Sequence, residues 1–507
     1  MTLQLNRRSF MGLSVAATAT AALAACTPAT APARPKRILP GDPLVADYES
    51  KRPSTGAGVR QDLAPAPFTT TLAGKTITTW GYNGALVAPT IRAQAGDLLD
   101  VTVANGLPEA TSIHWHGLAL RNDADGVPGL TQDPIAAGQD YPYSFKLPHP
   151  GTYWYHSHVE MQRERALYGA LIVQDPQETL AYDRDWVIVL DDWLDGVTGT
   201  PDEVLQELSK GMGSMGGMNH GGGGGGMVMG HMLMGATSDF LGGDAGDVAY
   251  PLHLFNGRDP EDPETITAAA GERIRLRIIN AAGDTAYRVG VPGQQLTLTH
   301  TDGFPVQHAD VDAVVLGMGE RIDALLTVRD GYTPVLALAE GKGQISFGLV
   351  STGTGTAPAK AALPTTLTGN VVDGGQLRAD PSVNLPARTP DRTHEVHLTG
   401  GMDQYDWGIN GHRFDMAKPL ENTFDLKVGE RVEVKFINDT DMWHPMHIHG
   451  HTFQVGDGGA RKDTVIVRPR QSVTVQFDAD NPGQWLFHCH NAYHAERGMM
   501  GVLSYIS

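Results

Sequence analysis

Twelve consecutive residues near the C-terminus carry a high density of side chains that bind soft metal ions. They comprise a thiol flanked by two imidazoles, a third imidazole five residues beyond the thiol, and a thioether ten residues beyond it. These residues are His488, Cys489, His490, His494 and Met499. One thiolate, two imidazoles and a weakly bound thioether form the ligand set of an electron-transfer copper site. Cys489, His494 and Met499 supply three of these ligands, and His444 is the natural candidate for the fourth.

The two imidazoles beside Cys489 predict a second metal site. Side chains alternate along a β-strand, so His488 and His490 face away from Cys489. A metal bound to the thiolate therefore lies one residue from another metal centre, with a covalent route for electrons between them. The alternative interpretation is a histidine-rich surface tract.

Three more His-x-His pairs complete a large set of imidazoles. The spacing within each pair lets both rings lie on the same face of a strand. The pairs are His114 with His116, His156 with His158, and His447 with His449. Four pairs, together with His444 and His494, provide ten imidazoles, which disfavours the surface tract.

In all four motifs, and from about Ala64 onward, the sequence resembles the multicopper oxidases, the family of laccases, cuprous oxidases and ascorbate oxidase. Three short stretches are typical of the bacterial three-domain, membrane-anchored copper-resistance oxidases. They are Arg121-Asn122-Asp123, Leu241-Gly242-Gly243-Asp244, and Tyr493-His494 before Ala495.

The resemblance implies four copper ions. The type 1 copper would take His444, Cys489 and His494, with Met499 as axial ligand and Met500 as the less favoured alternative. The other three ions would form a trinuclear cluster. Its implied ligands are His114 and His447 for the type 2 copper, and His116, His156, His158, His449, His488 and His490 for the type 3 pair. Electrons taken from substrate would pass through Cys489 to His488 and His490, and dioxygen would be reduced to water.

Proton supply to such a cluster needs carboxylates. Asp125, eleven residues after His114, matches a family acid beside the cluster, and the alternative is an ordinary loop aspartate. Some relatives carry an acid directly after the second type 1 histidine, where this chain has Ala495. Either Glu496 reaches the cluster from a position shifted by one residue, or another group relays protons.

Length and charge restrict the classes of function. A chain of 507 residues is expected to form about two to four domains. The net charge of -19 argues against nucleic acid as a partner, because phosphate contacts need Lys and Arg. It suits the attraction of cations, copper included. With only two cysteines, Cys26 and Cys489, both assigned other roles, we expect no intrachain disulfide.

The N-terminal sequence predicts an export segment. Arg7-Arg8 precede a short apolar run, which predicts a twin-arginine signal over residues 1–25. Leu23-Ala24-Ala25-Cys26 resembles a lipoprotein cleavage box, so we expect a lipid on Cys26 and an extracytoplasmic protein anchored to a membrane. The alternative is an ordinary cleavable signal. The Pro/Ala/Thr-rich residues 26–63 are expected to be a disordered tether.

The remaining chain contains a threefold repeat. Each copy has a turn glycine, an acidic residue, an alternating strand and an asparagine, over residues 95–105, 270–280 and 428–438. Alternation marks half-buried strands, and the recurring strands and turns indicate an all-β fold. We expect three cupredoxin-like Greek-key domains at residues 64–178, 179–351 and 389–507, with a linker at 352–388. The second copy lacks histidine pairs and is expected to bind no metal.

Residues 211–235 form a loop rich in methionine and glycine. Exposed thioethers are soft ligands for Cu(I), whereas the alternative is a flexible loop without a ligand role. The methionines are Met212, Met215, Met218, Met227, Met229, Met232 and Met234. Asp441 and Met442, just before His444, lie where some cuprous oxidases hold substrate copper, although a plain strand-to-loop junction is equally compatible.

Two substrates for a multicopper oxidase therefore stay open. The methionine-rich loop and the predicted anchor favour oxidation of Cu(I) to Cu(II) in copper tolerance. Laccase-like oxidation of phenols and aromatic amines is the alternative. A copper storage or carrier protein could use the loop as well, but would not need Cys489 between two cluster histidines.

Overall fold

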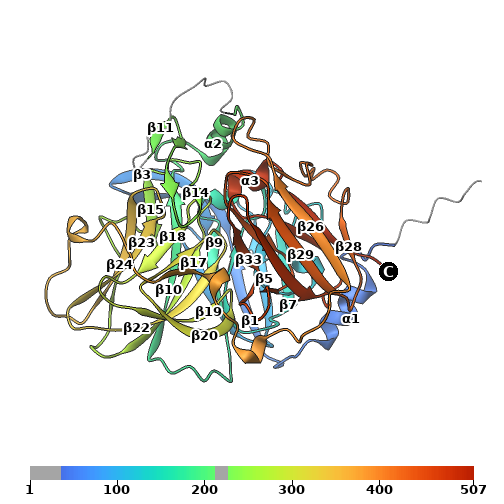
Figure 1. Ribbon diagram of the computed structural model, residues 1–507, viewed down its shortest axis with the longest axis horizontal. Coiled ribbons are helices and arrows are strands. Elements are labelled where there is room, and N and C mark those ends of the chain that lie inside the picture. Colours follow the sequence, from blue (N-terminus) through green and yellow to red (C-terminus); the bar gives the residue numbers. More distant parts are fainter. Residues whose placement is uncertain (1–35, 212–225) are drawn as a thin grey trace, which may run out of the picture. The chain divides into compact units, whose positions relative to one another are not determined.

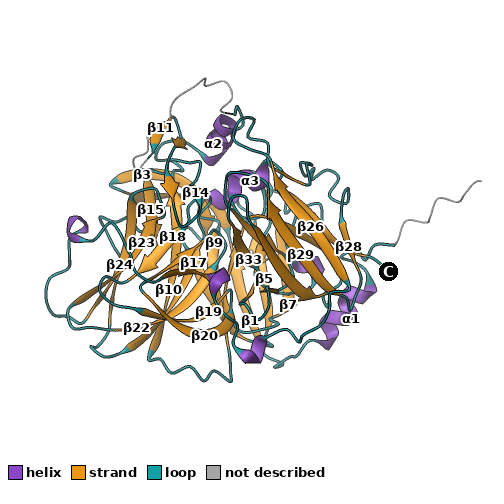
Figure 2. Cartoon of the chain, in the orientation of Figure 1, coloured by secondary structure: helices purple, strands orange, loops and turns teal. Residues whose placement is uncertain are grey.

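The computed structural model describes residues 36–211 and 226–507. Strands dominate this part of the chain (Figure 2), so the expected all-β class is confirmed. The strands fall into three consecutive groups, each containing a pair of larger sheets. The described residues include no helix that is both long and apolar enough to cross a membrane.

The first group contains two sheets and a hairpin. The three-stranded sheet is ordered β1 (Gly58–Leu63), β5 (Leu98–Ala104), β7 (Asp140–Lys146). The four-stranded sheet is ordered β4 (Ala88–Gln94), β9 (Tyr168–Gln174), β8 (Gly151–His156), β6 (His114–His116). The hairpin joins β2 (Pro65–Leu72) to β3 (Lys75–Tyr82).

The second group has two six-stranded sheets. One is ordered β15 (Leu252–Phe255), β10 (Arg184–Trp193), β17 (Arg273–Asn280), β22 (Arg321–Thr327), β19 (Leu296–Thr301), β20 (Phe304–Val311). The other is ordered β16 (Thr265–Thr267), β24 (Gln344–Ser351), β23 (Tyr332–Ala339), β18 (Tyr287–Gly290), β21 (Ala313–Leu316), β25 (Val371–Asp373). Two short hairpins pair β11 (Met227–Met229) with β12 (Met232–Met234) and β13 (Thr237–Ser238) with β14 (Gly243–Asp244).

The third group has a six-stranded and a five-stranded sheet. The first is ordered β27 (Gly408–Ile409), β26 (Arg392–Thr399), β29 (Arg431–Asn438), β34 (Ser472–Asp478), β31 (Phe453–Val455), β32 (Arg461–Lys462). The second is ordered β28 (Phe424–Leu426), β36 (Met500–Tyr505), β35 (Gln484–Cys489), β30 (His444–Ile448), β33 (Thr464–Val467).

Helices are few and short. The α-helices are α1 (Pro43–Lys51), α2 (Pro201–Leu208) and α3 (Ala492–Glu496). The 3-10 helices are η1 (Asn122–Ala124), η2 (Glu160–Glu164), η3 (Lys360–Ala362), η4 (Gly374–Gln376) and η5 (Pro381–Val383). In Figure 1, β26, β29 and α3 of the third group are coloured orange to red and lie on the right of the ribbon.

The threefold repeat in the sequence corresponds to one strand in each group. β5, β17 and β29 each pair in parallel with the first main strand of their group. The asparagine at the end of each copy is buried, donates its amide to two backbone carbonyls and accepts a backbone N–H two residues on. Two of these bonds satisfy buried backbone carbonyls and the third satisfies a backbone N–H, and only an amide side chain provides both functions, which explains why the same residue type recurs.

Two expectations about the connecting segments need correction. Residues 26–63 are predicted to be a disordered tether, and this is wrong for part of the segment, because α1 and β1 lie within it. Asp42 caps α1 by accepting the Leu44 N–H, and Glu49 accepts the Lys146 N–H at 2.9 Å. The predicted linker at 352–388 likewise contributes β25, which pairs with β21 of the second group.

Candidate metal centre

Two pairs of neighbouring strands position the histidines. β6 and β8 are antiparallel in the first group, with His114 opposite His156. β30 and β35 are antiparallel in the third group, with His447 opposite His488. Because alternate residues of a strand share a face, the imidazoles of each strand pair lie side by side on one face of the sheet.

The ligand atoms converge into mixed groups. His116 and His156 from the first strand group lie with His490 from the third, and all three ligand atoms are within 4.8 Å of one another. The other mixed groups that contain only histidines, on the same criterion, are His158 with His449 and His488, and His114 with His116 and His447. Each therefore draws on both ends of the folded chain.

The free ring nitrogens show that these imidazoles suit a metal. Six of them have a buried ring nitrogen without a hydrogen-bond partner in the described chain: His114, His116, His156, His158, His447 and His490. The other ring nitrogen is fixed in several cases; His156 Nδ1, for example, lies 2.8 Å from the Ser157 carbonyl oxygen. Burial lowers the pKa of His156, His158 and His490. A buried neutral imidazole with an unpaired nitrogen and a fixed opposite nitrogen is suited to bind a metal, and these imidazoles also converge with others.

A thiolate site stands beside this cluster. Cys489 Sγ lies 3.6 Å from His444 Nδ1 and 3.7 Å from His494 Nδ1, and the two nitrogens are 3.1 Å apart. Asn491 caps α3 by accepting the Tyr493 and His494 N–H groups, which places His494 beside the thiol. Copper fits this soft donor set.

The axial position favours Met499 over Met500. Met499 is fully buried in the same apolar cluster as Cys489, and its carbonyl accepts the Cys489 N–H at 3.0 Å. Met500 is the next residue along the strand and packs into a different cluster with Val127 and Leu486.

Two hydrogen bonds that the sequence did not reveal orient the thiolate-side imidazoles. Asp247, from the second strand group, has its Oδ2 3.0 Å from His494 Nε2 and accepts the Tyr405 hydroxyl at 2.7 Å. Thr440 Oγ1 lies 2.8 Å from His444 Nε2. Burial lowers the pKa of His494, but the bonds to Asp247 and Cys489 outweigh it and raise the pKa to about 10. The site therefore favours positive charge.

Asp125 lies against the imidazole cluster. It is fully buried, its Oδ2 is 3.0 Å from His449 Nδ1, and its carbonyl oxygen is 2.9 Å from His114 Nδ1. Asp463, which the sequence reasoning missed, has the same relation to two other imidazoles. Its Oδ1 lies 3.1 Å from His116 Nε2, and its carbonyl oxygen is 2.9 Å from His447 Nδ1.

Glu496 lines a narrow crevice together with His158 and His488. Glu160 and Arg163 line the same crevice. Burial of the carboxyl raises the pKa of Glu496 to about 7, against the opposing charge of Arg163. The shifted position of this glutamate therefore still brings it beside two cluster histidines.

The methionine-rich loop is only partly within the described residues. Met212, Met215 and Met218 lie outside them. Met227 on β11 is 56% exposed, and Met229 and Met234 are half-buried. Met232 is buried in the core that also contains Cys489, so the expectation of an exposed thioether is wrong there.

The side chains of Asp441 and Met442, predicted as a site for substrate copper, lie in different environments. Asp441 is exposed and forms an ion pair with Arg470. Met442 is buried in the core beside the thiolate site, and its carbonyl accepts the Asn438 amide. The two side chains therefore do not form one exposed ligand pair.

Family models described as multicopper oxidase match residues 67–178, 184–341 and 387–506. A protein of Mycobacterium tuberculosis named multicopper oxidase MmcO is 41% identical, covering 99% of this chain and 97% of that protein. Copper resistance protein A of Escherichia coli is 29% identical, covering 87% of this chain and 92% of that protein.

Solved structures show the same fold. Fet3p, a multicopper oxidase that functions in iron import, superposes with a TM-score of 0.74 at 21% identity, over 88% of this chain and 90% of that chain. Laccase from Botrytis aclada superposes with a TM-score of 0.73 at 24% identity, over 91% of this chain and 89% of that chain. The expected arrangement of three cupredoxin-like domains is thereby confirmed.

Proposed function

The chain belongs to the multicopper oxidase family, and from that premise we propose that it oxidises Cu(I) to Cu(II) while reducing dioxygen to water with four copper ions. One observation carries the proposal. The thiolate of Cys489 sits in one donor group, while His488 and His490 on either side of it belong to two others.

The protein residues have separable tasks in this reaction. Copper bound at the two sites supplies one-electron transfer and dioxygen reduction. The backbone from Cys489 to its neighbours joins the sites covalently. Asp125 Oδ2 lies 3.0 Å from His449 Nδ1 and its Oδ1 lies 3.3 Å from His114 Nδ1, so this carboxylate is placed between two cluster imidazoles, where a proton relay is needed. Glu496 can pass protons from the crevice.

The methionine hairpin supports Cu(I) as substrate. The Leu233 N–H donates to the Asp247 carbonyl at 2.8 Å, and Met232 forms a β-bridge with Val248. The β11–β12 hairpin is therefore hydrogen-bonded to the segment whose carboxylate contacts His494. Thioethers at the surface and an electron-accepting imidazole are joined through one short piece of backbone.

Leucine substitutions test the hairpin without dismantling it. Deleting the loop would remove the buried Met232, whereas the triple variant Met227→Leu, Met229→Leu, Met234→Leu keeps side-chain volume and removes soft donors. We expect its KM for Cu(I) to rise and its kinetics with a phenol to stay unchanged. Met416→Leu, an exposed methionine outside the hairpin, is the matched control.

Unchanged Cu(I) kinetics in the triple variant would instead favour the laccase-like alternative. Relatives named laccase, such as laccase-2 of Botryotinia fuckeliana at 26% identity over 88% of this chain, make phenols and aromatic amines the second candidate substrates. Rates of oxygen uptake measured with Cu(I) and with a phenol show which of the two candidate substrates is preferred. A pure storage protein would consume no oxygen with either.

The copper content has its own test. The wild-type chain is expected to bind four coppers and to be blue. Cys489→Ser should lose the blue colour and the oxidase activity while copper stays in the cluster, because only the thiolate site is changed. Metal analysis and the visible spectrum decide, and one copper or fewer per wild-type chain would end the proposal.

We propose further that the protein is exported by the twin-arginine route and anchored by a lipid on Cys26. The supporting observation is Arg7-Arg8 ahead of the Leu-Ala-Ala-Cys box, all of which lie outside the described residues. Cys26→Ala should move the protein from the membrane to the soluble fraction. Unchanged membrane association would contradict the anchor.

A further inference from the structure

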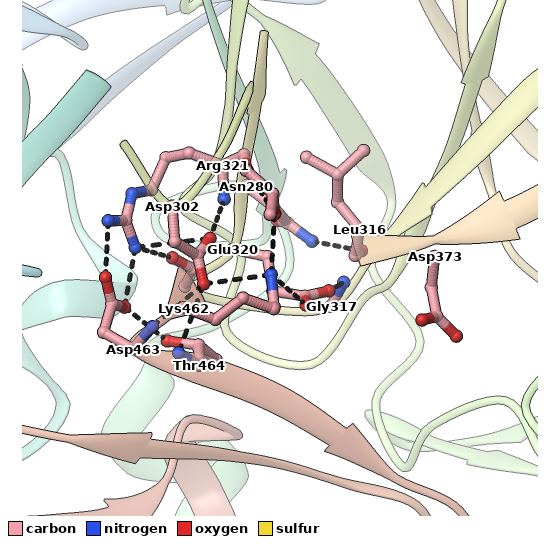
Figure 3. Close-up of polar contacts among 12 residues, drawn as sticks. Asn280, Asp302, Leu316, Gly317, Glu320, Arg321, Asp373, Lys462, Asp463 and Thr464 are labelled. Atoms are coloured by element: carbon pink, nitrogen blue, oxygen red, sulfur yellow. Dashed lines mark hydrogen bonds and ion pairs between the residues drawn. The ribbon is translucent and has the colours of Figure 1, made fainter. Parts of the chain in front are cut away.

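A buried charge network joins domain 2, residues 179–351, to the imidazole cluster, although domain 2 supplies none of the grouped ligands. Figure 3 shows Arg321, Asp302 and Glu320 from domain 2 facing Lys462 and Asp463 from domain 3. All five side chains are at most 1% exposed. Charges buried this deeply need partners with good geometry.

Arg321 holds Asp463 with both arms of its guanidinium. Nη1 donates to Asp463 Oδ1 at 2.8 Å and Nη2 to Oδ2 at 2.6 Å. The guanidinium is itself fixed, since Nε donates to the Thr152 carbonyl at 3.0 Å and Nη1 to the Gly319 carbonyl at 3.0 Å. A planar fork matched to a carboxylate defines orientation as well as charge.

The same carboxylate also contacts cluster imidazoles, through its Oδ1. Asp463 Oδ1 lies 3.1 Å from His116 Nε2 and 3.3 Å from His447 Nδ1. These two rings are stacked, with centroids 3.8 Å apart. The contact with Asp463 leaves His116 Nδ1 and His447 Nε2 as the free nitrogens. The bond to the carboxylate thus selects which nitrogen of each ring can bind metal.

A glycine supplies a second, independent contact from domain 2. Gly319 has a φ of +86°, and a Cβ there would meet atoms of His116 and His490 at 3.0 Å. Gly117, beside His116, is equally constrained, because a Cβ would meet Arg321 Nη2 at 2.3 Å. The backbone of domain 2 is therefore packed directly against the cluster, and the guanidinium fills the remaining space.

We propose that Arg321 is a positioning residue through which domain 2 sets the ring orientation and metal-binding nitrogens of His116 and His447. Because it concerns the copper cluster, the inference rests on the proposed function. Without the guanidinium fork, Asp463 loses the partner that aims its Oδ1 at both rings. The thiolate site has no contact with this network in the described chain, so it provides an internal reference.

Arg321→Lys tests the role of the fork, because it keeps the positive charge and removes bidentate geometry. Arg275→Lys is the matched control: Arg275 binds Asp323 at 2.6 Å, the pair is 3% and 1% exposed, and neither residue contacts a grouped ligand. Each copper-free protein is reconstituted with copper. Copper per chain, the blue absorption and the electron paramagnetic resonance of the copper without a thiolate are then measured.

For Arg321→Lys we expect loss of about one copper per chain, or an altered resonance of the copper without a thiolate, with the blue absorption at the wild-type level. Arg275→Lys should keep all three properties. If Arg321→Lys proves insoluble, Asp463→Asn decides: it keeps the size of the side chain, and its single acceptor oxygen cannot engage both guanidinium arms, so the same selective change is expected.

A full copper complement with wild-type resonance in Arg321→Lys, or in Asp463→Asn where that variant decides, would overturn the inference. Equal loss of copper from both sites would overturn it too, since that would show a general packing role. Failure of the proposed function looks different, because the wild-type protein would then itself bind one copper or fewer.

Discussion

Asp247→Asn is expected to raise the reduction potential of the thiolate-bound copper. The carboxylate Oδ2 lies 3.0 Å from His494 Nε2, and the side chain is buried. Adding the width of the ring and a metal–nitrogen bond of about 2 Å places the charge about 7 Å from the metal. The nearby negative charge stabilises Cu(II) more than Cu(I), so its removal favours reduction.

The size of the shift follows from Coulomb's law. Two unit charges ~7 Å apart interact by about 2 kcal/mol at an effective dielectric constant of about 20. For a one-electron couple, a change of 1.4 kcal/mol corresponds to about 59 mV, so the potential should rise by about 100 mV. Asparagine can still accept a hydrogen bond from His494, so the ring orientation is retained.

Redox titration of the blue absorption measures this shift directly. Asp441→Asn is the control, because Asp441 lies three residues before His444 but its side chain is 87% exposed. Solvent screens such a charge, and a shift below about 20 mV is expected. If Asp247→Asn moves the potential no further than Asp441→Asn, or lowers it, then the buried carboxylate does not act on the copper as a charge.

Three further outcomes are expected. Burial and the charge of Asp192 raise the pKa of Glu164 to about 8 from 4.5, so the stability contributed by this group is greatest below pH 4.5 and falls by up to about 5 kcal/mol as pH rises through 8. Glu164→Gln should therefore reduce the pH dependence of Tm of the copper-free protein between pH 4.5 and 8, and an unchanged dependence would contradict this. Asn280→Ala removes three buried hydrogen bonds and should lower the free energy of unfolding, measured with denaturant, by about 2–3 kcal/mol, with copper content unchanged. A loss no larger than that caused by Asn370→Ala, at an exposed asparagine, would contradict this. Deleting residues 36–57 should lower Tm by a few degrees, because α1 is docked through the bond from the Lys146 N–H to Glu49, whereas a tether could be removed without effect.

Local rules made most of the metal centre predictable. Alternation of side chains along strands separates Cys489 from His488 and His490, and the spacing of the repeat fixes which glycine and asparagine recur. These features depend on neighbours in sequence. The capped start of α1, Asp42 before Pro43, is also a local signal, but the Pro/Ala/Thr-rich composition around it is typical of a tether.

The residues that were missed act over long separations. Asp247 meets His494 from 247 positions away, and Arg321 meets Asp463 from 142 positions away. No local pattern distinguishes such an acid from one that lies in a loop. The burial of Met232 was missed for the same reason, since it depends on pairing with Val248 rather than on the glycine-rich sequence around it.

Each imidazole group combines residues from early and late in the chain, so the order of synthesis determines when a group can be completed. Three all-histidine groups combine residues from 114–158 with residues from 447–490, and the ribosome releases the second set last. A nascent chain that has emerged as far as residue 400 therefore lacks at least one ligand of each of these groups. The imidazole groups can therefore be completed only after residue 490 has been synthesised and the two ends of the chain have folded together.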